Sequence, residues 1–210
     1  MQQNSPVRRR GRPPKDQAGH SETRQALLSA GVAALTEKGF SATGIEEVLR
    51  RVNVPKGSFY HYFKSKEAFG AELIDRYDRY FCGKLDHILL NEDRTPLQRL
   101  HDFVDDAKEG MRRYEFSRGC LVGNLGQEMG ALPASYRNLL IEVFLDWQLR
   151  TATCLRAAID AGEVDARIDC DRMAEFFWIG WEGAVLRAKL EKSDMPLTRF
   201  ATVFFAGLAK

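Results

Sequence analysis

Two short helical segments joined by a tight turn, within residues 43–63, constrain the fold of this chain more than any other feature. The letters TGIE at residues 43–46 form a capping box, which predicts a short helix running to about residue 52. Asn53-Val-Pro55 predicts a turn, because the residue before proline disfavours helix and proline suits a first helical position. A further helix is expected from Pro55 to about Phe63. Two helices paired so closely, behind a longer one, form a helix-turn-helix pattern.

The chain after residue 19 has helical periodicity almost throughout. Ser21 is expected to cap the first helix, and Gly39 to end it. Later helices are expected to begin at capping residues or prolines, namely Ser65, Thr95, Pro133, Asp169 and Pro196. A short helix that begins near Cys120 should end by Gly130. The sequence therefore predicts an all-α fold of about nine helices.

The net charge of +2 conceals an asymmetry along the chain. Residues 1–66 hold twelve Lys and Arg against five Asp and Glu, whereas residues 67–210 hold 19 against 24. The basic third is the part that can approach a polyanion. A mobile arm at its start, rich in proline and arginine, suits the narrow minor groove of DNA, and the alternative is a solubilising tail. The arginines expected to contact DNA are Arg8, Arg9, Arg10 and Arg12.

The third expected helix carries cations and aromatic side chains on one short segment. Phe59 and Phe63 are four residues apart and should face the core. The other side chains can meet phosphates, base edges and thymine methyl groups, whereas the alternative is a solvated basic surface. The DNA-binding candidates on this segment are Lys56, Gly57, Ser58, Tyr60, His61, Tyr62, Lys64 and Lys66.

The stretch from Thr43 to Phe69, with VPKGSFYHYFKSKEAF at its centre, resembles the DNA-binding domain of the TetR family of transcriptional regulators. The resemblance implies a homodimer whose three N-terminal helices bind double-stranded operator DNA and whose larger helical domain binds an effector. Two-fold symmetry then implies a palindromic operator. We accordingly expect a basic flexible arm at 1–20, a helix-turn-helix domain at 21–66 and an effector-binding and dimerisation domain at 67–210.

The stretch GCLVGNLGQEMG, residues 119–130, is the candidate sensor segment. Cys120 should stand at the first turn of its short helix, where the helix N-terminus and nearby arginines would favour thiolate over thiol. Asn124 and Gln127 follow at i+4 and i+7, so they share a helix face with Cys120. That face is expected to bind a small polar ligand.

A second candidate face lies in FFWIGWEGAVLRAKLE, near the C-terminus. Trp178, Glu182 and Lys189 lie at i, i+4 and i+11 of one helix, and charged groups on an otherwise apolar helix are costly to bury unless they are paired or meet a ligand. One reading is an ion pair between Glu182 and Lys189, or exposure at the helix end. The other is a ligand site in which Lys189 or Arg187 meets a carboxylate and Trp178 or Trp181 forms an apolar wall.

These two segments also resemble those of particular TetR-family repressors. RGCLVGNLGQEMGALP and FFWIGWEGAVLRAKLE resemble members that respond to acrylate, which implies release from the operator by a small unsaturated carboxylate or its thioester. The GCL and AKL steps also resemble members that respond to electrophiles, which implies a thiol switch at Cys120 with Lys189 nearby. Asn124 and Gln127 follow the first pattern, so binding of a small ligand is the preferred hypothesis. No base is suggested beside Cys120, so an enzyme is not expected, and no cofactor is implied.

The last two expected helices are candidates for a dimer interface. Apolar residues lie on more than one face of residues 176–186, and apolar residues repeat at helical spacing in residues 200–208. An intramolecular core would leave too many of these faces uncovered. The resemblance likewise places the dimer contacts at the end of the chain.

Other features exclude several classes of protein. The four cysteines are widely spaced without neighbouring histidines, so neither a metal site nor a disulfide framework is indicated. No run of eighteen apolar residues or signal-peptide pattern is present, so no membrane association is expected. The protein is expected to be cytoplasmic.

Overall fold

The computed structural model describes residues 17–208. Within that range the chain forms nine α-helices and one short 3-10 helix and contains no strand, so the expected all-α fold is confirmed. The four arginines of the predicted arm lie outside the described residues. The last residues assigned to that arm, 17–20, are already helical.

Three helices build the N-terminal end of the molecule. They are α1 (Gln17–Lys38), α2 (Ile45–Arg51) and α3 (Phe59–Tyr62), with the 3-10 helix η1 (Lys56–Ser58) leading into α3. Their shared core buries Leu35, Leu49 and Phe59 almost completely. Burying each such side chain contributes roughly 1.5–3 kcal/mol, which is what holds helices this short in place.

The starts of the first two helices differ from the sequence-based expectation. Helix α1 begins at Gln17, so Ser21 lies inside it instead of capping it. Thr43 does not cap α2, because its Oγ1 donates a hydrogen bond to the carbonyl of Gly39 at 2.6 Å. The hydroxyl is buried against the end of α1, and Gly44 takes the position before α2 without a side-chain cap.

The turn between α2 and η1 has the expected place and a specific backbone conformation. Asn53 has φ +53°, in the left-handed region that asparagine tolerates better than most residues. The amide of Val54 donates to the carbonyl of Leu49 at 3.0 Å, which satisfies an end group of α2. The structure thus confirms the turn at Asn53-Val-Pro55.

Six further helices form the larger part of the molecule. They are α4 (Lys66–Leu89), α5 (Pro96–Arg113), α6 (Leu121–Gln127), α7 (Ser135–Asp160), α8 (Cys170–Glu191) and α9 (Met195–Ala206). Ser65 and Asp169 cap α4 and α8 as expected, by accepting backbone hydrogen bonds at 2.9 and 3.2 Å. Thr95 makes no such bond, because Glu163 accepts the free Leu97 amide instead, at 2.9 Å.

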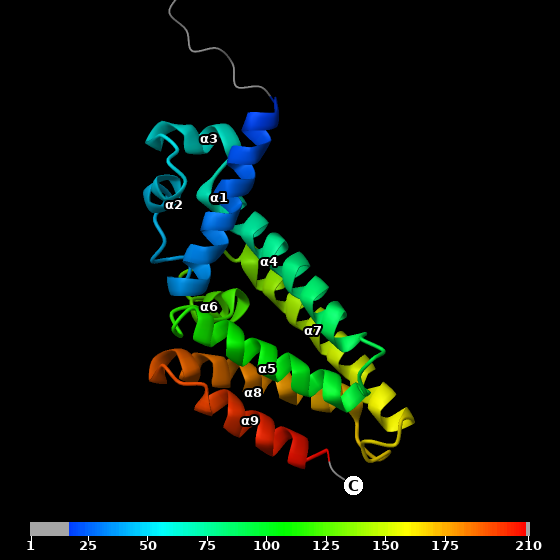
Figure 1. Ribbon diagram of the computed structural model, residues 1–210. Helices are drawn as coiled ribbons and strands as arrows, with labels where there is room; N and C mark the ends of the chain where they lie inside the picture. Colours follow the sequence, from blue (N-terminus) through cyan, green and yellow to red (C-terminus); the bar gives the residue numbers. More distant parts are fainter. Residues whose placement is uncertain (1–16, 209–210) are drawn as a thin grey trace, which may run out of the picture.

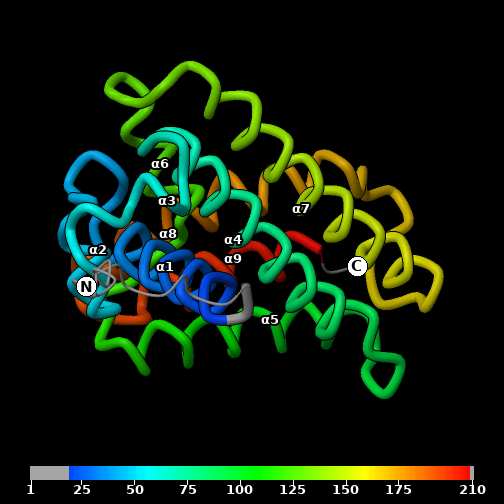
Figure 2. Tube along the Cα trace, turned by 90° about the horizontal axis from the view of Figure 1, so that it is seen from above, coloured from blue at the N-terminus to red at the C-terminus, as the bar shows by residue number. Residues whose placement is uncertain are grey.

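Helix α4 connects the two ends of the molecule (Figure 1). It leaves the α1–α3 end and runs beside α7, while α5, α8 and α9 lie together at the opposite end. Helix α6 lies under the C-terminal end of α1 and contacts it. Seen from above, α1, α2 and α3 lie over one end of the larger part, and α4 and α7 extend away from them (Figure 2).

An aromatic core holds α4, α5, α7 and α8 together. Trp147 and Trp178 have ring centroids 4.9 Å apart, and Phe103 lies 5.8 Å from Trp178. The indole of Trp178 donates to Thr151 Oγ1 at 3.0 Å, which satisfies its buried N–H. None of the helices in the described part of the chain has the length and apolar character needed to cross a membrane.

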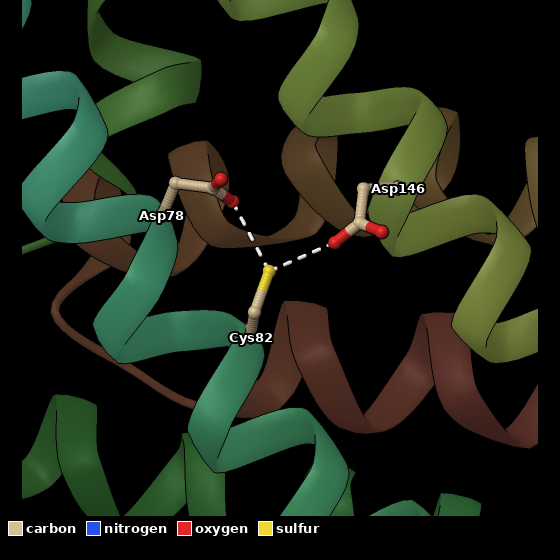
Figure 3. Close-up of side chains that lie close together, drawn as sticks. All are labelled: Asp78, Cys82 and Asp146. Atoms are coloured by element: carbon tan, nitrogen blue, oxygen red, sulfur yellow. Dashed lines mark hydrogen bonds between the residues drawn. The ribbon is translucent and has the colours of Figure 1, made fainter.

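A second contact between α4 and α7 is polar. Cys82 Sγ lies 3.1 Å from Asp78 Oδ1 and 2.9 Å from Asp146 Oδ2 (Figure 3). These three ligand-type atoms lie within 4.8 Å of one another, the one such grouping among residues 17–208. Both carboxylates already accept hydrogen bonds, from Trp147 Nε1 at 3.3 Å and from Arg150 Nε at 2.9 Å. We therefore assign this cluster to helix packing.

Candidate functional site

A pocket of about 330 Å³ lies between the N-terminal helices and the larger part of the molecule. Helices α1, α4, α5 and α8 contribute its walls, and residues 118–120, just before α6, close one side. The pocket combines aromatic walls with a few polar groups, as ligand sites usually do. We call it the sensor pocket; its aromatic lining residues are Tyr77, Tyr80, Phe81, Phe103, Tyr114 and Trp181.

Cys120 lines the sensor pocket and caps α6, close to the first turn where the sequence placed it. Its Sγ accepts a hydrogen bond from the Gly123 amide at 3.4 Å. The expectation of an acidic thiol is wrong, however. Burial, together with the neighbouring Glu182 carboxylate, raises the pKa of Cys120 well above its usual value. The nearby arginines do not offset this, because Arg118 pairs with Glu37 at 3.0 Å and Arg112 pairs with Asp194.

Glu182 of α8 lies directly beside Cys120. A Cβ at position 123 would lie 1.9 Å from Glu182 Oε2 and 3.6 Å from the Cβ of Cys120, so Gly123 leaves the space that the carboxylate occupies. Burial raises the pKa of Glu182 to about 7, and a hydrogen bond from the Cys120 thiol partly opposes this rise. Near neutral pH, Glu182 is therefore protonated in a substantial fraction of the molecules and ionised in the others.

Tyr77 of α4 completes this group of three. Its hydroxyl lies beside the Cys120 thiol and the Leu121 amide. Burial, with smaller contributions from Cys120 and Glu182, raises the pKa of Tyr77 well above its usual value. The phenol is thus a neutral hydrogen-bond donor at physiological pH. Tyr77, Cys120 and Glu182, from three different elements, all line the sensor pocket and form what we call the thiol cluster.

Two cations stand at the wall of the same pocket. Lys84 forms an ion pair with Asp106, and Arg118 pairs with Glu37 and lies 4.1 Å above the Tyr114 ring. Each is partly exposed, with 28% and 31% of its side chain accessible. Both can therefore turn toward an anionic ligand group at modest cost.

Asn124 and Lys189 do not line the sensor pocket. Asn124 Nδ2 donates to the carbonyls of Leu35 and Thr36 at 2.9 and 3.1 Å. Lys189 Nζ donates to the carbonyl of Glu37 at 2.6 Å, and it also reaches Thr36. Burial lowers the pKa of Lys189, and the Glu37 carboxylate opposes that change. Both side chains therefore donate to carbonyl groups in the last turn of α1, most of which lack a backbone partner further along the helix.

The backbone and a further acid strengthen this contact. The Gly119 amide donates to the Thr36 carbonyl at 2.9 Å, and Glu128 accepts from the Ser41 amide at 2.8 Å. We call these interactions, together with those of Asn124 and Lys189, the α1 clamp. The clamp connects the sensor segment and α8 directly to the last turn of α1 and to the residues that follow it.

Two other predicted ligand residues lie away from the pocket. Gln127 is exposed on α6, and Trp178 is buried in the aromatic core. Of the predicted ligand set, the structure brings Cys120, Trp181 and Glu182 together at the sensor pocket. Glu182 and Lys189 do not form an ion pair, because they contact different groups.

Sequence reasoning missed the walls that α4 and α5 supply. Tyr77, Tyr80 and Phe81 occur at i, i+3 and i+4, so they share one face of α4. That spacing was a usable signal for an aromatic surface. Nothing in the linear sequence, however, indicated that this surface faces Cys120.

The candidate DNA-contacting residues lie at the far end of the N-terminal helices. Lys56, Gly57, Tyr60, His61 and Lys64 are exposed, with Tyr60 70% accessible, and Ser58 is half-buried. Phe59 and Phe63 are buried, as expected. Partners within the chain also hold several of these candidates: Lys56 pairs with Glu46 at 2.5 Å, Tyr62 stacks on His20 with centroids 4.6 Å apart, and Lys66 Nζ lies 4.5 Å from the Phe40 ring centroid.

An apolar surface remains exposed on α8 and α9. Ile179 and Leu190 are 67% and 71% accessible, although Trp181 and Phe177 on the same helix are buried. Gly180 allows the Phe200 ring of α9 to approach, because a Cβ there would lie 2.3 Å from that ring. The two helices therefore pack tightly on each other and still leave apolar side chains uncovered.

Comparisons with known proteins agree with this architecture. Residues 27–73 match the family described as bacterial regulatory proteins, tetR family, and residues 96–204 match the tetracyclin repressor-like C-terminal domain. The transcriptional regulator AcuR of Cereibacter sphaeroides is 53% identical over 93% of this chain and 89% of its own length. The transcriptional repressor NemR of Escherichia coli is 29% identical over 84% of this chain and 88% of its length.

A solved structure shows the same fold. The crystal structure of a regulatory protein TetR from Rhodobacter sphaeroides is 53% identical, with a TM-score of 0.86. It covers 88% of this chain, and this chain covers 97% of it. Both family matches, the relatives and the fold agree: the chain belongs to the TetR family of transcriptional regulators.

Proposed function

We propose that this TetR-type repressor leaves a palindromic operator when a small α,β-unsaturated carboxylate, such as acrylate, or its thioester binds in the sensor pocket. The observation that carries the proposal is the composition of the pocket wall. Ser29, Val32, Ala33 and Thr36 of α1 face the same space as Cys120 and Glu182. A ligand in that space contacts a helix of the DNA-binding end directly.

The pocket chemistry suits a short unsaturated acid. Its aromatic walls can contact the carbon chain, while Lys84 or Arg118 can pair with the carboxylate. A volume of about 330 Å³ accommodates a small molecule, and a thioester could extend through the open side of the pocket.

Release then requires the ligand to prefer one arrangement of the protein over another. In a homodimer, two reading helices must match successive half-sites on one face of DNA. A ligand that binds the DNA-incompetent arrangement more tightly by several kcal/mol shifts the population away from the operator-bound form.

Gel-shift titration of the operator complex tests the effector class. Acrylate should release the operator, and Lys84→Met should raise the acrylate concentration required about tenfold or more, since a hydrogen bond to a charged group is lost. Lys108→Met is the matched control, because Lys108 also pairs with an aspartate on the protein surface and does not line the pocket. Equal effects of the two variants would argue against a carboxylate beside Lys84.

A second candidate function is a thiol switch, favoured by the position of Cys120. The other three cysteines are buried, whereas Cys120 lines the pocket. If binding is noncovalent, Cys120→Ser leaves release by acrylate largely intact. If release requires a bond to sulfur, Cys120→Ser abolishes it, with or without reductant. A Cys120→Ser variant that still responds to both carboxylates and electrophiles would exclude the switch.

A further inference from the structure

The thiol cluster places a carboxylate, a thiol and a phenol around one corner of the sensor pocket. The Glu182 carboxylate and the Tyr77 hydroxyl both lie beside the Cys120 thiol, close enough for each to influence its pKa. Gly123 keeps the carboxylate close, because any side chain at that position would collide with Glu182 Oε2. All three functional groups face a space that can hold a small molecule.

We propose that Glu182 accepts the thiol proton of Cys120 as the sulfur adds to the β-carbon of an α,β-unsaturated carbonyl compound bound in the sensor pocket. The inference rests on the second candidate function, in which release from the operator requires a bond to the Cys120 sulfur. It assigns Glu182 a role in proton transfer, in place of the ion-pair or ligand-contact roles expected for it from the sequence.

The proposed step is balanced without a further reactant. The S–H bond breaks, the proton moves to a Glu182 oxygen, and the S–C bond forms. The π electrons of the C=C bond move toward the carbonyl, and the α-carbon then takes the proton back from Glu182. The product is a thioether, and nothing is oxidised or reduced.

The surroundings explain why a bound electrophile would react while the resting thiol is protected. Burial keeps Cys120 protonated at neutral pH, so reagents that need a free thiolate find little of it. Glu182, with a pKa of about 7, is ionised often enough to accept a proton and acidic enough to return it. Tyr77 can hold the sulfur in position by donating a hydrogen bond to it from the neutral phenol.

Few other charged groups face this corner. Lys84 from α4 and Arg118 from the segment before α6 line the pocket, with the phenols of Tyr80 and Tyr114. The pocket residues of α1 and α5 are uncharged. Lys84 and Arg118 already pair with Asp106 and Glu37, so Glu182 is the carboxylate available to the thiol.

The rate of adduct formation at Cys120, measured against pH, tests the assignment. The probe is acrylamide, a neutral unsaturated carbonyl compound, and peptide mass spectrometry of the full-length protein counts the Cys120 adduct between pH 5.5 and 9. The wild-type rate should rise through an apparent pKa near 7 and then level off. Glu182→Gln should remove this step and lower the rate at pH 7 by about tenfold to a hundredfold.

Two further variants separate a proton acceptor from a structural residue. Glu182→Asp keeps the carboxylate and should restore part of the step in the pH profile. Glu191→Gln, at an exposed position on the same helix, should keep the wild-type profile. A Glu182→Gln profile identical to that of the wild type would overturn the inference, as would the absence of any Cys120 adduct in the wild-type protein.

The adduct measurement tests the role of Glu182, whereas the operator measurement tests the effector class, so either claim can be wrong while the other holds. If acrylate releases the operator but acrylamide gives no Cys120 adduct, the proposed function stands in its noncovalent form and the role of Glu182 is wrong. If neither compound releases the operator but the adduct forms with the expected pH step, the effector class is wrong and Glu182 keeps its assigned role.

Discussion

Gly123, Cys120 and Glu182 show how one missing side chain sets the chemistry of a site. Because residue 123 has no Cβ, the Glu182 carboxylate can lie against the sulfur. A helix N-terminus lowers a thiol pKa by a modest amount, whereas burial beside a carboxylate raises it more strongly. The second effect prevails at Cys120, which reverses the expectation drawn from the sequence.

The same residues predict a pH dependence of stability. Burial raises the pKa of Glu182 from 4.5 to about 7 in the folded protein, so the folded state binds this proton more tightly than the unfolded state does. The resulting stability is complete below about pH 4.5 and is lost as the pH rises toward 7. The glutamine of the Glu182→Gln variant cannot ionise. The free energy of unfolding of this variant should therefore rise relative to that of the wild type over this pH interval, by up to about 3 kcal/mol at pH 7 and above.

Thermal unfolding of both proteins across pH 4.5–8 measures this difference. Glu191→Gln, on the same helix but exposed, should show no such trend. If the unfolding temperatures of Glu182→Gln and the wild type differ by the same amount at every pH, Glu182 has an ordinary pKa in the folded protein.

Among the elements, the C-terminal end of α1 joins the two parts of the molecule. Its carbonyl groups are bound by Asn124, Lys189 and the Gly119 amide, which belong to the sensor segment and α8. Helix α1 also forms part of the pocket wall. A ligand that shifts the segment before α6 therefore acts on the end of a helix that carries the DNA-binding core.

Lys189→Met tests the clamp. Losing the ammonium leaves carbonyls at the end of α1 without their cation, which should lower the free energy of unfolding by about 1–2 kcal/mol. Operator release should also need more effector, because the clamp transmits less of the change in the pocket. Urea unfolding and gel-shift titration measure the two effects.

Lys192→Met is the matched control, since Lys192 is exposed just beyond the same helix. If Lys189→Met lowers stability but releases the operator at the wild-type effector concentration, the clamp is structural and takes no part in signalling.

At the scale of the whole molecule, we propose that the exposed apolar surface of α8 and α9 forms the interface of a homodimer, the assembly typical of the TetR family. The sequence predicted these two helices as the interface, and Ile179 and Leu190 are still uncovered in the single chain. Burying these side chains against a second copy of the chain would contribute favourably to the free energy of dimer formation. Two-fold symmetry would then set the spacing of the two reading helices.

Ile179→Glu should therefore shift the protein from dimer to monomer and abolish tight operator binding, because a buried unpaired charge opposes association. Size-exclusion chromatography with light scattering measures the mass, and a gel shift measures DNA binding. Leu149→Glu is the control: Leu149 is also exposed, at 58%, but lies on α7. If Leu149→Glu dissociates the dimer and Ile179→Glu does not, the interface lies on α7.

Sequence reasoning predicted correctly most of the features that depend on local interactions. Prolines, apolar periodicity and the caps Ser65 and Asp169 located helices, and the sequence also predicted the turn at Asn53 and the place of Cys120 near the start of a short helix, because such signals act within a few residues. Contacts between distant segments were decided by the tertiary structure alone. Thr43 turned back to Gly39, Asn124 and Lys189 turned to the end of α1, and Tyr77 came to face Cys120. Helical spacing shows which side chains share a face but does not show what that face meets, and burial against those partners sets both the pocket and the pKa values of its groups.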